Sequence, residues 1–168
     1  RQRLMHKIIN AWALLGGFLL LLIVGATAIN AAGFTANAVA RLFDGNVAGL
    51  SGYEDGVTML VGVAALAMFP YCQLHGGHAA VDVFMSKAPA AANRFIAYLS
   101  AGLTIVLALS MAVMLSYGMM EVRADGVETA VLGWPVWIFI GPAIVSCILW
   151  AIAAGLQIVQ PPEESDGT

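Results

Sequence analysis

The chain has 168 residues, of which 61% are hydrophobic and 10% are charged, and its formal net charge at pH 7 is −3. Ordinary soluble domains contain about 25% charged residues, because their surfaces need polar groups. The composition therefore excludes an ordinary soluble enzyme, a nucleic-acid-binding protein and a disordered chain, and it indicates an integral membrane protein.

Four uncharged segments predict four transmembrane helices. Lys7 and Arg41 enclose 33 residues without Asp, Glu, Lys or Arg, and the later segments have 26 residues after Asp55, 26 after Arg94 and 34 after Glu128. About 20 apolar residues cross a hydrocarbon core of roughly 30 Å, so each segment holds one span. The segments lack the alternation of barrel strands, and a backbone in lipid must satisfy its own hydrogen bonds, so we expect an all-α fold. We place the spans at about 11–36, 54–74, 92–119 and 133–158.

The basic residues predict which side of the membrane each loop faces. Arg1, Arg3 and Lys7 precede the first span, Lys87 and Arg94 lie between the second and third, and Arg41 and Arg123 lie in the other two loops. Cytoplasmic loops carry the excess of Lys and Arg, so we expect both termini in the cytoplasm. We expect residues 1–160 to form a single membrane domain, followed by an acidic tail at 161–168.

The first span also resembles a secretory signal peptide, because a basic segment precedes an apolar run that ends in Ala26-Thr27-Ala28. This run is longer than the apolar region of a usual signal peptide. We therefore expect it to remain as the first span.

No Asp, Glu, Lys or Arg lies near the middle of a predicted span, whereas ion-coupled carriers usually keep an ionisable residue at membrane depth. We therefore do not expect a stand-alone transporter, and no set of residues predicts an enzyme. The polar residues within the predicted spans are uncharged, and we expect them to make hydrogen bonds between helices or to their own helix. These residues are Thr27, Asn30, Thr58, Thr104, Ser110 and Ser146.

Three histidines are the candidate ligands for a metal or haem. His6 lies in the basic amino end, and His75 and His78 flank Gly76-Gly77, where a continuing helix is unfavourable. No further His or Cys cluster completes a coordination shell, so we expect no metal and no cofactor. The alternatives are a haem- or quinone-associated anchor of a respiratory complex and a small homo-oligomeric channel.

Aromatic and Pro residues predict where the helices meet the membrane surfaces. Gly133-Trp134-Pro135 is expected to open the fourth span, with Pro135 at an early helical position. We expect the tryptophans at positions 134 and 137 at the outer interface, and those at 12 and 150 near the inner one. Pro70 should kink or end the second span. The stretch 76–88 is less apolar and predicts a short amphipathic helix on the cytoplasmic surface.

Two segments carry a resemblance to a known family. Tyr53-Glu54-Asp55 opens the second span, His78-Ala79-Ala80-Val81-Asp82 follows it, and Gly133-Trp134-Pro135-Val136-Trp137 opens the fourth. They resemble the small, Q-type (DctQ-like) membrane subunit of tripartite ATP-independent periplasmic (TRAP) transporters. That family tends to have an acid at the start of the second span, a His…Val-Asp signature after it, and Pro-Trp residues at the fourth. Ala79 departs from the larger aliphatic residue usual there, and Leu74-His75 replaces a frequent basic residue.

The resemblance implies four spans in a bacterial or archaeal inner membrane and a non-catalytic role. Such a subunit pairs with a large multi-span (M-type) membrane subunit, which carries the substrate and sodium sites, and it widens the static scaffold of that subunit. It also offers a docking surface to a periplasmic substrate-binding protein. The transported substrates are usually organic acids, such as dicarboxylates or sialic acids.

The resemblance also assigns residues. The motif positions are Glu54, His78, Val81, Asp82, Trp134 and Pro135. On a helix, His78 and Asp82 share a face, so they either tie the surface segment to a neighbouring element or face water. The acids of the outer loops either meet basic groups of the binding protein or are simply solvated. They are Glu54, Asp55, Glu121, Asp125 and Glu128.

Overall fold

The computed structural model describes residues 2–43, 45–46, 49, 51–75 and 90–159. About 87% of these residues are helical, and no strand occurs among them. The elements are α1 (Gln2–Ala40) with the short 3-10 helix η1 (Arg41–Phe43), α2 (Tyr53–Leu74), α4 (Ala90–Ala124) and α5 (Trp137–Val159). The four α-helices are long and apolar enough to cross a membrane, which confirms the predicted all-α, four-span fold.

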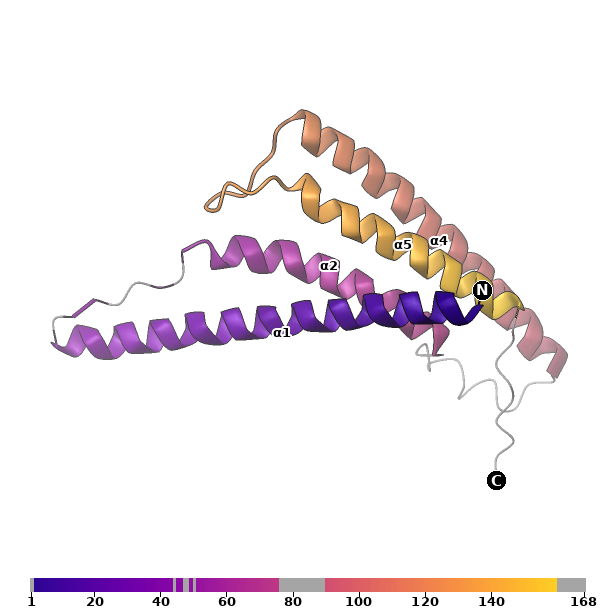
Figure 1. Ribbon diagram of the computed structural model, residues 1–168, viewed down its shortest axis with the longest axis horizontal. Helices are drawn as coiled ribbons and strands as arrows, with labels where there is room; N and C mark the ends of the chain where they lie inside the picture. The colour runs from indigo at the N-terminus through magenta and orange to yellow at the C-terminus, as the bar shows by residue number, and fades with distance from the viewer. Residues whose placement is uncertain (1, 44, 47–48, 50, 76–89, 160–168) are drawn as a thin grey trace, which may run out of the picture.

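The helices fall into two length classes. α2 and α5 have 22 and 23 residues, which gives about 33–35 Å at a rise of 1.5 Å per residue. α1 and α4 have 39 and 35 residues, or about 58 and 52 Å, and they exceed a hydrocarbon core of roughly 30 Å. Both long helices extend past the spans predicted for them, and α1 projects beyond the start of α2 (Figure 1).

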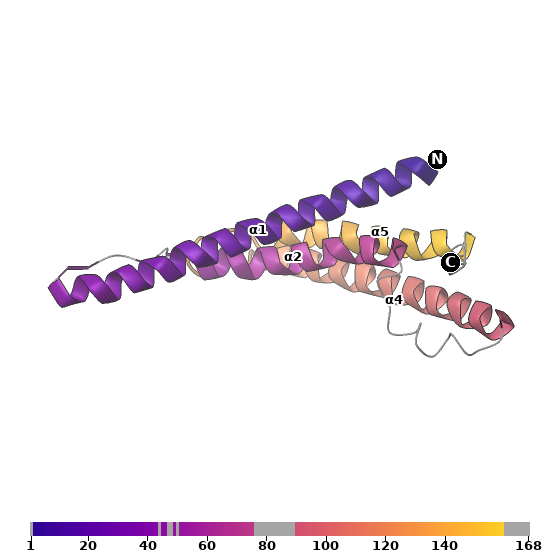
Figure 2. The ribbon, with the colours of Figure 1, turned by 90° about the horizontal axis from the view of Figure 1, so that it is seen from below.

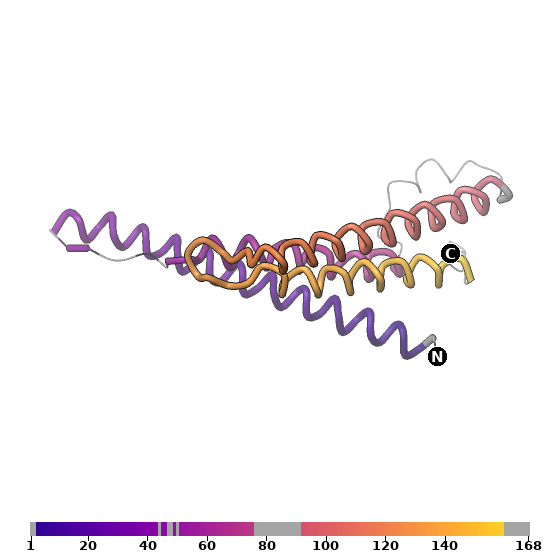
Figure 3. The backbone as a smooth tube through the Cα atoms, turned by 90° about the horizontal axis from the view of Figure 1, so that it is seen from above, coloured from indigo at the N-terminus to yellow at the C-terminus, as the bar shows by residue number. Residues whose placement is uncertain are grey.

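The helices form an open row rather than a closed bundle. α1 packs on α2, α2 packs on α5, and α5 packs on α4, so that α1 and α4 lie at the edges (Figure 1). α1 is inclined to the other three helices (Figures 2 and 3). In the apolar segment of α5, 44% of the residues are buried within the chain, against 17% in α4 and 11% in α1. The core therefore lies around α5.

Small residues bring neighbouring helices close together. A Cβ atom on Gly16 would lie 2.8 Å from Cβ of Ala67 and 3.2 Å from the carbonyl oxygen of Ala64. On the other side of the row, the fully buried Ala108 packs with Trp150 and Ala151. In lipid, helix association depends on such close van der Waals contact, because apolar side chains gain little by leaving lipid for protein.

The start of α5 corrects the prediction. α5 begins at Trp137, so residues 133–136 precede the helix, and Pro135 forms an isolated antiparallel bridge with Glu128. Gly133 has a φ of 63°, which a right-handed helix does not accommodate. Pro70 lies inside α2, which ends one turn later at Leu74. The predicted surface helix at 76–88 and the acidic tail at 161–168 lie outside the described residues.

Candidate functional site at the loop end of the helices

Residues 125–136 connect α4 to α5 as an ordered hairpin, here called the hairpin 125–136. The backbone N–H of Val136 donates to the carbonyl of Val127 at 3.1 Å, and the N–H of Thr129 donates to the carbonyl of Trp134 at 2.9 Å. The Thr129 hydroxyl is buried with its residue and accepts a hydrogen bond from the N–H of Trp134 at 3.0 Å. These bonds give the connection a fixed shape of its own.

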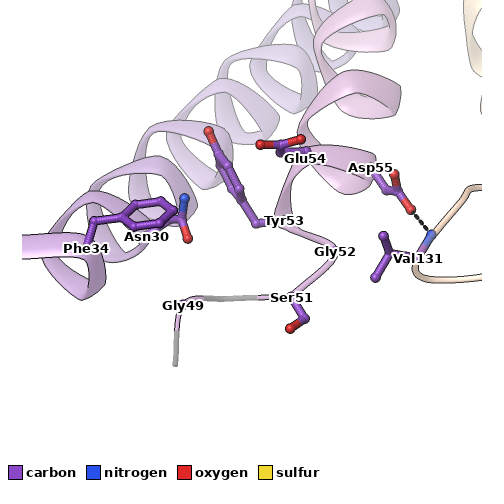
Figure 4. Close-up of a pocket in the computed structure, with 9 residues that line it drawn as sticks. All are labelled: Asn30, Phe34, Gly49, Ser51, Gly52, Tyr53, Glu54, Asp55 and Val131. Atoms are coloured by element: carbon purple, nitrogen blue, oxygen red, sulfur yellow. Dashed lines mark hydrogen bonds between the residues drawn. The ribbon is translucent and has the colours of Figure 1, made fainter. Parts of the chain in front are cut away.

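Asp55 joins α2 to this hairpin. Its Oδ2 accepts hydrogen bonds from the backbone N–H groups of Val131 at 2.7 Å and Leu132 at 3.1 Å. Figure 4 shows the Asp55 carboxylate facing Val131. Asp55 lies in the first turn of α2, where a negative charge also interacts favourably with the helix dipole. A side chain at the start of α2 thus holds the backbone of the hairpin 125–136.

Gly52 allows the two connections to approach this closely. Its φ is 80°, a conformation that L-residues rarely adopt. A Cβ atom at this position would lie 2.6 Å from Cδ2 and 2.8 Å from Cγ of Leu132. Both the backbone conformation and the contact with Leu132 therefore require glycine here.

An open pocket of about 320 Å³ lies beside this contact, between the end of α1 and the start of α2 (Figure 4). Its lining combines aromatic, amide, hydroxyl and carboxylate groups: Asn30, Phe34, Gly49, Ser51, Gly52, Tyr53, Glu54, Asp55 and Val131. Asn30 is the buried member, at 8% exposure, whereas Glu54 is exposed. The pocket is open to its surroundings.

The end of α4 and the hairpin 125–136, which carry the other predicted docking acids, lie at the same end of the row as the start of α2 (Figure 1). Glu121, Asp125 and Glu128 are all exposed. Arg123, in the last turn of α4, has its guanidinium 4.9 Å from the ring centroid of Trp137. Asp55 differs from the other acids because it is hydrogen-bonded to the hairpin. The sequence placed all five acids in one class, and only the structure separates this residue from them.

A buried polar cluster at the opposite end was missed by the sequence analysis. Gln73 is 4% exposed, its Oε1 accepts from Nε1 of Trp150 at 3.2 Å, and its Nε2 donates to Oε1 of Gln157 at 2.6 Å. Nε2 of Gln157 donates in turn to the backbone carbonyl of Gln73. The two glutamines near the ends of predicted spans were the available signal. Trp150 is also buried against Phe69, with ring centroids 5.0 Å apart.

The uncharged polar residues within the spans make two kinds of hydrogen bond, within one helix and between helices. Thr27 and Ser110 donate to carbonyls of their own helices, at 2.8 Å to Ile23 and 2.8 Å to Leu107. Ser146 does the same to Pro142 and also accepts from Nε1 of Trp12 at 2.9 Å, which links α5 to α1.

The candidate ligand residues do not form a metal site in the described part of the chain, where no group of three or more His, Cys, Asp or Glu side chains could hold an ion. His75 follows the end of α2, and its ring stacks on Tyr71 with centroids 4.1 Å apart. His78, Val81 and Asp82 lie outside the described residues.

The family model described as "Tripartite ATP-independent periplasmic transporters, DctQ component" matches residues 31–162. The chain belongs to this family. The matched range includes α2, α4, α5, the hairpin 125–136 and the end of α1, so the Asp55 contact lies within it.

DctQ membership confirms the resemblance and gives the chain its class. It is a small, multi-pass membrane component of a three-part transporter, a class that is generally non-enzymatic, and the class implies a large membrane component and a binding protein as partners. No finding supports the alternative of a respiratory anchor. No curated protein sequence and no solved structure matches the chain.

Proposed function

We propose that this DctQ chain is the scaffold that supports the large membrane subunit of a sodium-coupled transporter for organic acids. The main observation that supports this scaffold role is that the helices form an open row. Both edge helices expose long apolar stripes, formed on α1 by Leu14, Phe18, Leu21 and Ile29, and on α4 by Phe95, Leu99, Leu103, Val106, Val113, Tyr117 and Met120. A scaffold needs two such faces, one against its partner and one against lipid.

The absence of deep charges supports a division of work between subunits. No Asp, Glu, Lys or Arg lies near the middle of a span, so we assign the sodium and substrate sites to the large subunit. We assign the chain to the inner membrane, with both termini in the cytoplasm and the hairpin 125–136 outside.

Assembly tests the scaffold role. Two double variants would each place bulky side chains on one exposed stripe. The first carries Leu103→Trp and Val106→Trp on α4, and the second carries Leu21→Trp and Gly25→Trp on α1. We expect one pair to lower co-purification of the large subunit in mild detergent, because it widens a packed interface, while the other pair is tolerated in lipid. If both pairs leave assembly and uptake unchanged, the scaffold role is contradicted.

Uptake tests the coupling ion. The two membrane subunits would be reconstituted in liposomes with the binding protein, and organic-acid uptake would be measured with an inward gradient of Na⁺ or of K⁺. We expect uptake only with Na⁺, and equal uptake with K⁺ would contradict sodium coupling.

We further propose that the exposed outer acids attract basic groups of the binding protein. These acids are Glu54, Glu121, Asp125 and Glu128. Screening shortens the Debye length from about 10 Å at 0.1 M to about 3 Å at 1 M salt, so docking should weaken as salt increases. Replacing Asp125 and Glu128 with Lys should reduce docking at low salt, and unchanged docking there would contradict the proposal.

A further inference from the structure

The hairpin 125–136 presents a mixed surface whose centre is apolar. Val131 is 63% exposed and Trp134 is 44% exposed, and the acids Asp125 and Glu128 are exposed beside them. Protein interfaces commonly combine an apolar, aromatic centre with a charged rim. The hairpin also lies at the loop end, beyond the start of α5, where a partner can reach it from solvent (Figure 1).

The direction of this surface depends on Asp55. The N–H of Val131 donates to Asp55, so the same residue is bound through its backbone and exposed through its side chain. The next N–H, that of Leu132, donates to the same carboxylate oxygen, and the Leu132 side chain approaches Gly52. The hairpin's internal bonds fix its shape, whereas the contact with Asp55 fixes its position relative to α2.

We propose that the hairpin 125–136 is the element that contacts the binding protein, and that Asp55 is a positioning residue for it rather than a docking acid. The inference rests on the proposed docking role. The occupant is a soluble partner with an apolar patch bordered by basic residues, because the exposed acids of this end complement such a rim. The exposed acids Glu121, Asp125 and Glu128 outnumber Arg123, whose guanidinium lies 4.9 Å from the ring centroid of Trp137.

Hydrogen exchange tests the positioning step in the assembled membrane complex. The amides of Val131 and Leu132 should exchange slowly in the wild type and faster in Asp55→Ala, because their acceptor is removed. Glu54→Ala is the matched control, since it removes the same charge from the same helical turn and leaves both amides protected. Equal protection in Asp55→Ala and the wild type would overturn the inference.

Docking tests the consequence. Uptake would be measured against the concentration of the cognate binding protein, identified by co-purification. Asp55→Ala should raise the half-saturating concentration about 5-fold or more, as expected for coupling between two contacts, and leave the maximal rate unchanged. Asp55→Asn keeps a carbonyl acceptor and should restore part of the loss. A fall in the maximal rate alone would indicate impaired assembly and overturn the positioning role.

The salt dependence of docking distinguishes a positioning role of Asp55 from a role as a docking charge. The effect of losing a docking acid should disappear near 1 M salt, where the Debye length is about 3 Å, whereas the Asp55→Ala defect should persist. A defect that disappears with salt would make Asp55 an ordinary docking acid and overturn the inference.

Direct changes to the hairpin distinguish this inference from the function on which it rests. If Val131→Asp and Trp134→Ala weaken docking but Asp55→Ala does not, the positioning role fails and the docking role stands. If none of the three weakens docking, both fail.

Discussion

Two side chains near the ends of α2 each join this helix to a distant part of the chain. Asp55 binds the hairpin at one end, and Gln73 binds Trp150 and Gln157 of α5 at the other. Both are polar groups at the margins of an apolar helix, where a hydrogen bond to another element replaces bonds to water. Their energetic effect comes mainly from the partners that would be left unpaired.

Replacing Gln73 with Leu should destabilise the chain by about 1–2 kcal/mol, because the buried Nε1 of Trp150 and the half-buried side chain of Gln157 lose a partner. The measurement is the midpoint of unfolding by SDS in mixed micelles. Gln157→Leu is the control: it leaves the bond between Gln73 and Trp150 in place and should cost less. An unchanged midpoint for Gln73→Leu would contradict the role of this cluster.

The closest approach between α1 and α2 should not tolerate one added methyl group. Gly16→Ala places a Cβ atom 2.8 Å from Cβ of Ala67, and overpacking of this kind costs about 1–3 kcal/mol. Gly25→Ala is the matched control, because no atom lies within 4 Å of its added Cβ and alanine favours the helix by about 1 kcal/mol. Equal unfolding midpoints for the two variants would show that the helices do not approach closely at Gly16.

At the scale of whole elements, α1 is held at separate levels along its length. Its N-terminal part contacts α5 through Ile9, Leu149 and Ala153, and Gly16, two turns further along, contacts α2. Contacts at separate levels fix the inclination of a helix that is too long for the hydrocarbon core.

The hydrogen bond between Trp12 and Ser146 contributes to this placement of α1. In a double-mutant cycle with Trp12→Phe and Ser146→Ala, we expect a coupling energy of about 0.6 kcal/mol, with an upper range near 1.7 kcal/mol. Ser146 also donates to Pro142, so Ser146→Ala alone changes a second bond, and the cycle removes that contribution. Strictly additive effects on unfolding would show that the two helices are not coupled there.

At the scale of the whole molecule, the row of helices has two distinct ends. The N-terminus and the end of α5 lie at one end, and the hairpin 125–136 lies at the other (Figure 1). An even number of spans requires the two ends of the chain to share a side. The distribution of Lys and Arg predicts that this side is the cytoplasm.

Cysteine labelling measures the orientation directly. Cys72 and Cys147 would be replaced with Ala, and a single cysteine introduced as Val127→Cys or Arg3→Cys. In cells with an intact inner membrane and a permeabilised outer membrane, a maleimide that cannot cross the inner membrane should label position 127 and not position 3. Replacing Arg3 also removes one positive charge, so Gln2→Cys serves as a second probe of that end. The reverse pattern would contradict the predicted orientation.

The class of fold follows from the composition and the spacing of charged residues. Charge-free segments of 26 to 34 residues allow few structures in lipid besides helices, so the four spans follow from composition and backbone hydrogen bonding. The motifs around Glu54, His78 and Trp134 also indicate the DctQ family. The start of the fourth helix was predicted four residues too early, because the positive φ of Gly133 depends on a turn that the Pro-Trp pattern does not reveal.

The choice of neighbouring helices and the role of each polar residue depend instead on contacts between distant parts of the chain. In a chain so rich in alanine and leucine, almost every helix face is compatible with either lipid or protein, so the pattern could not predict the open row or the central place of α5. Nor could it separate Asp55 from Glu54, its neighbour in the same turn. The difference between them is a carboxylate within reach of two backbone N–H groups that lie 76 and 77 residues further along the chain.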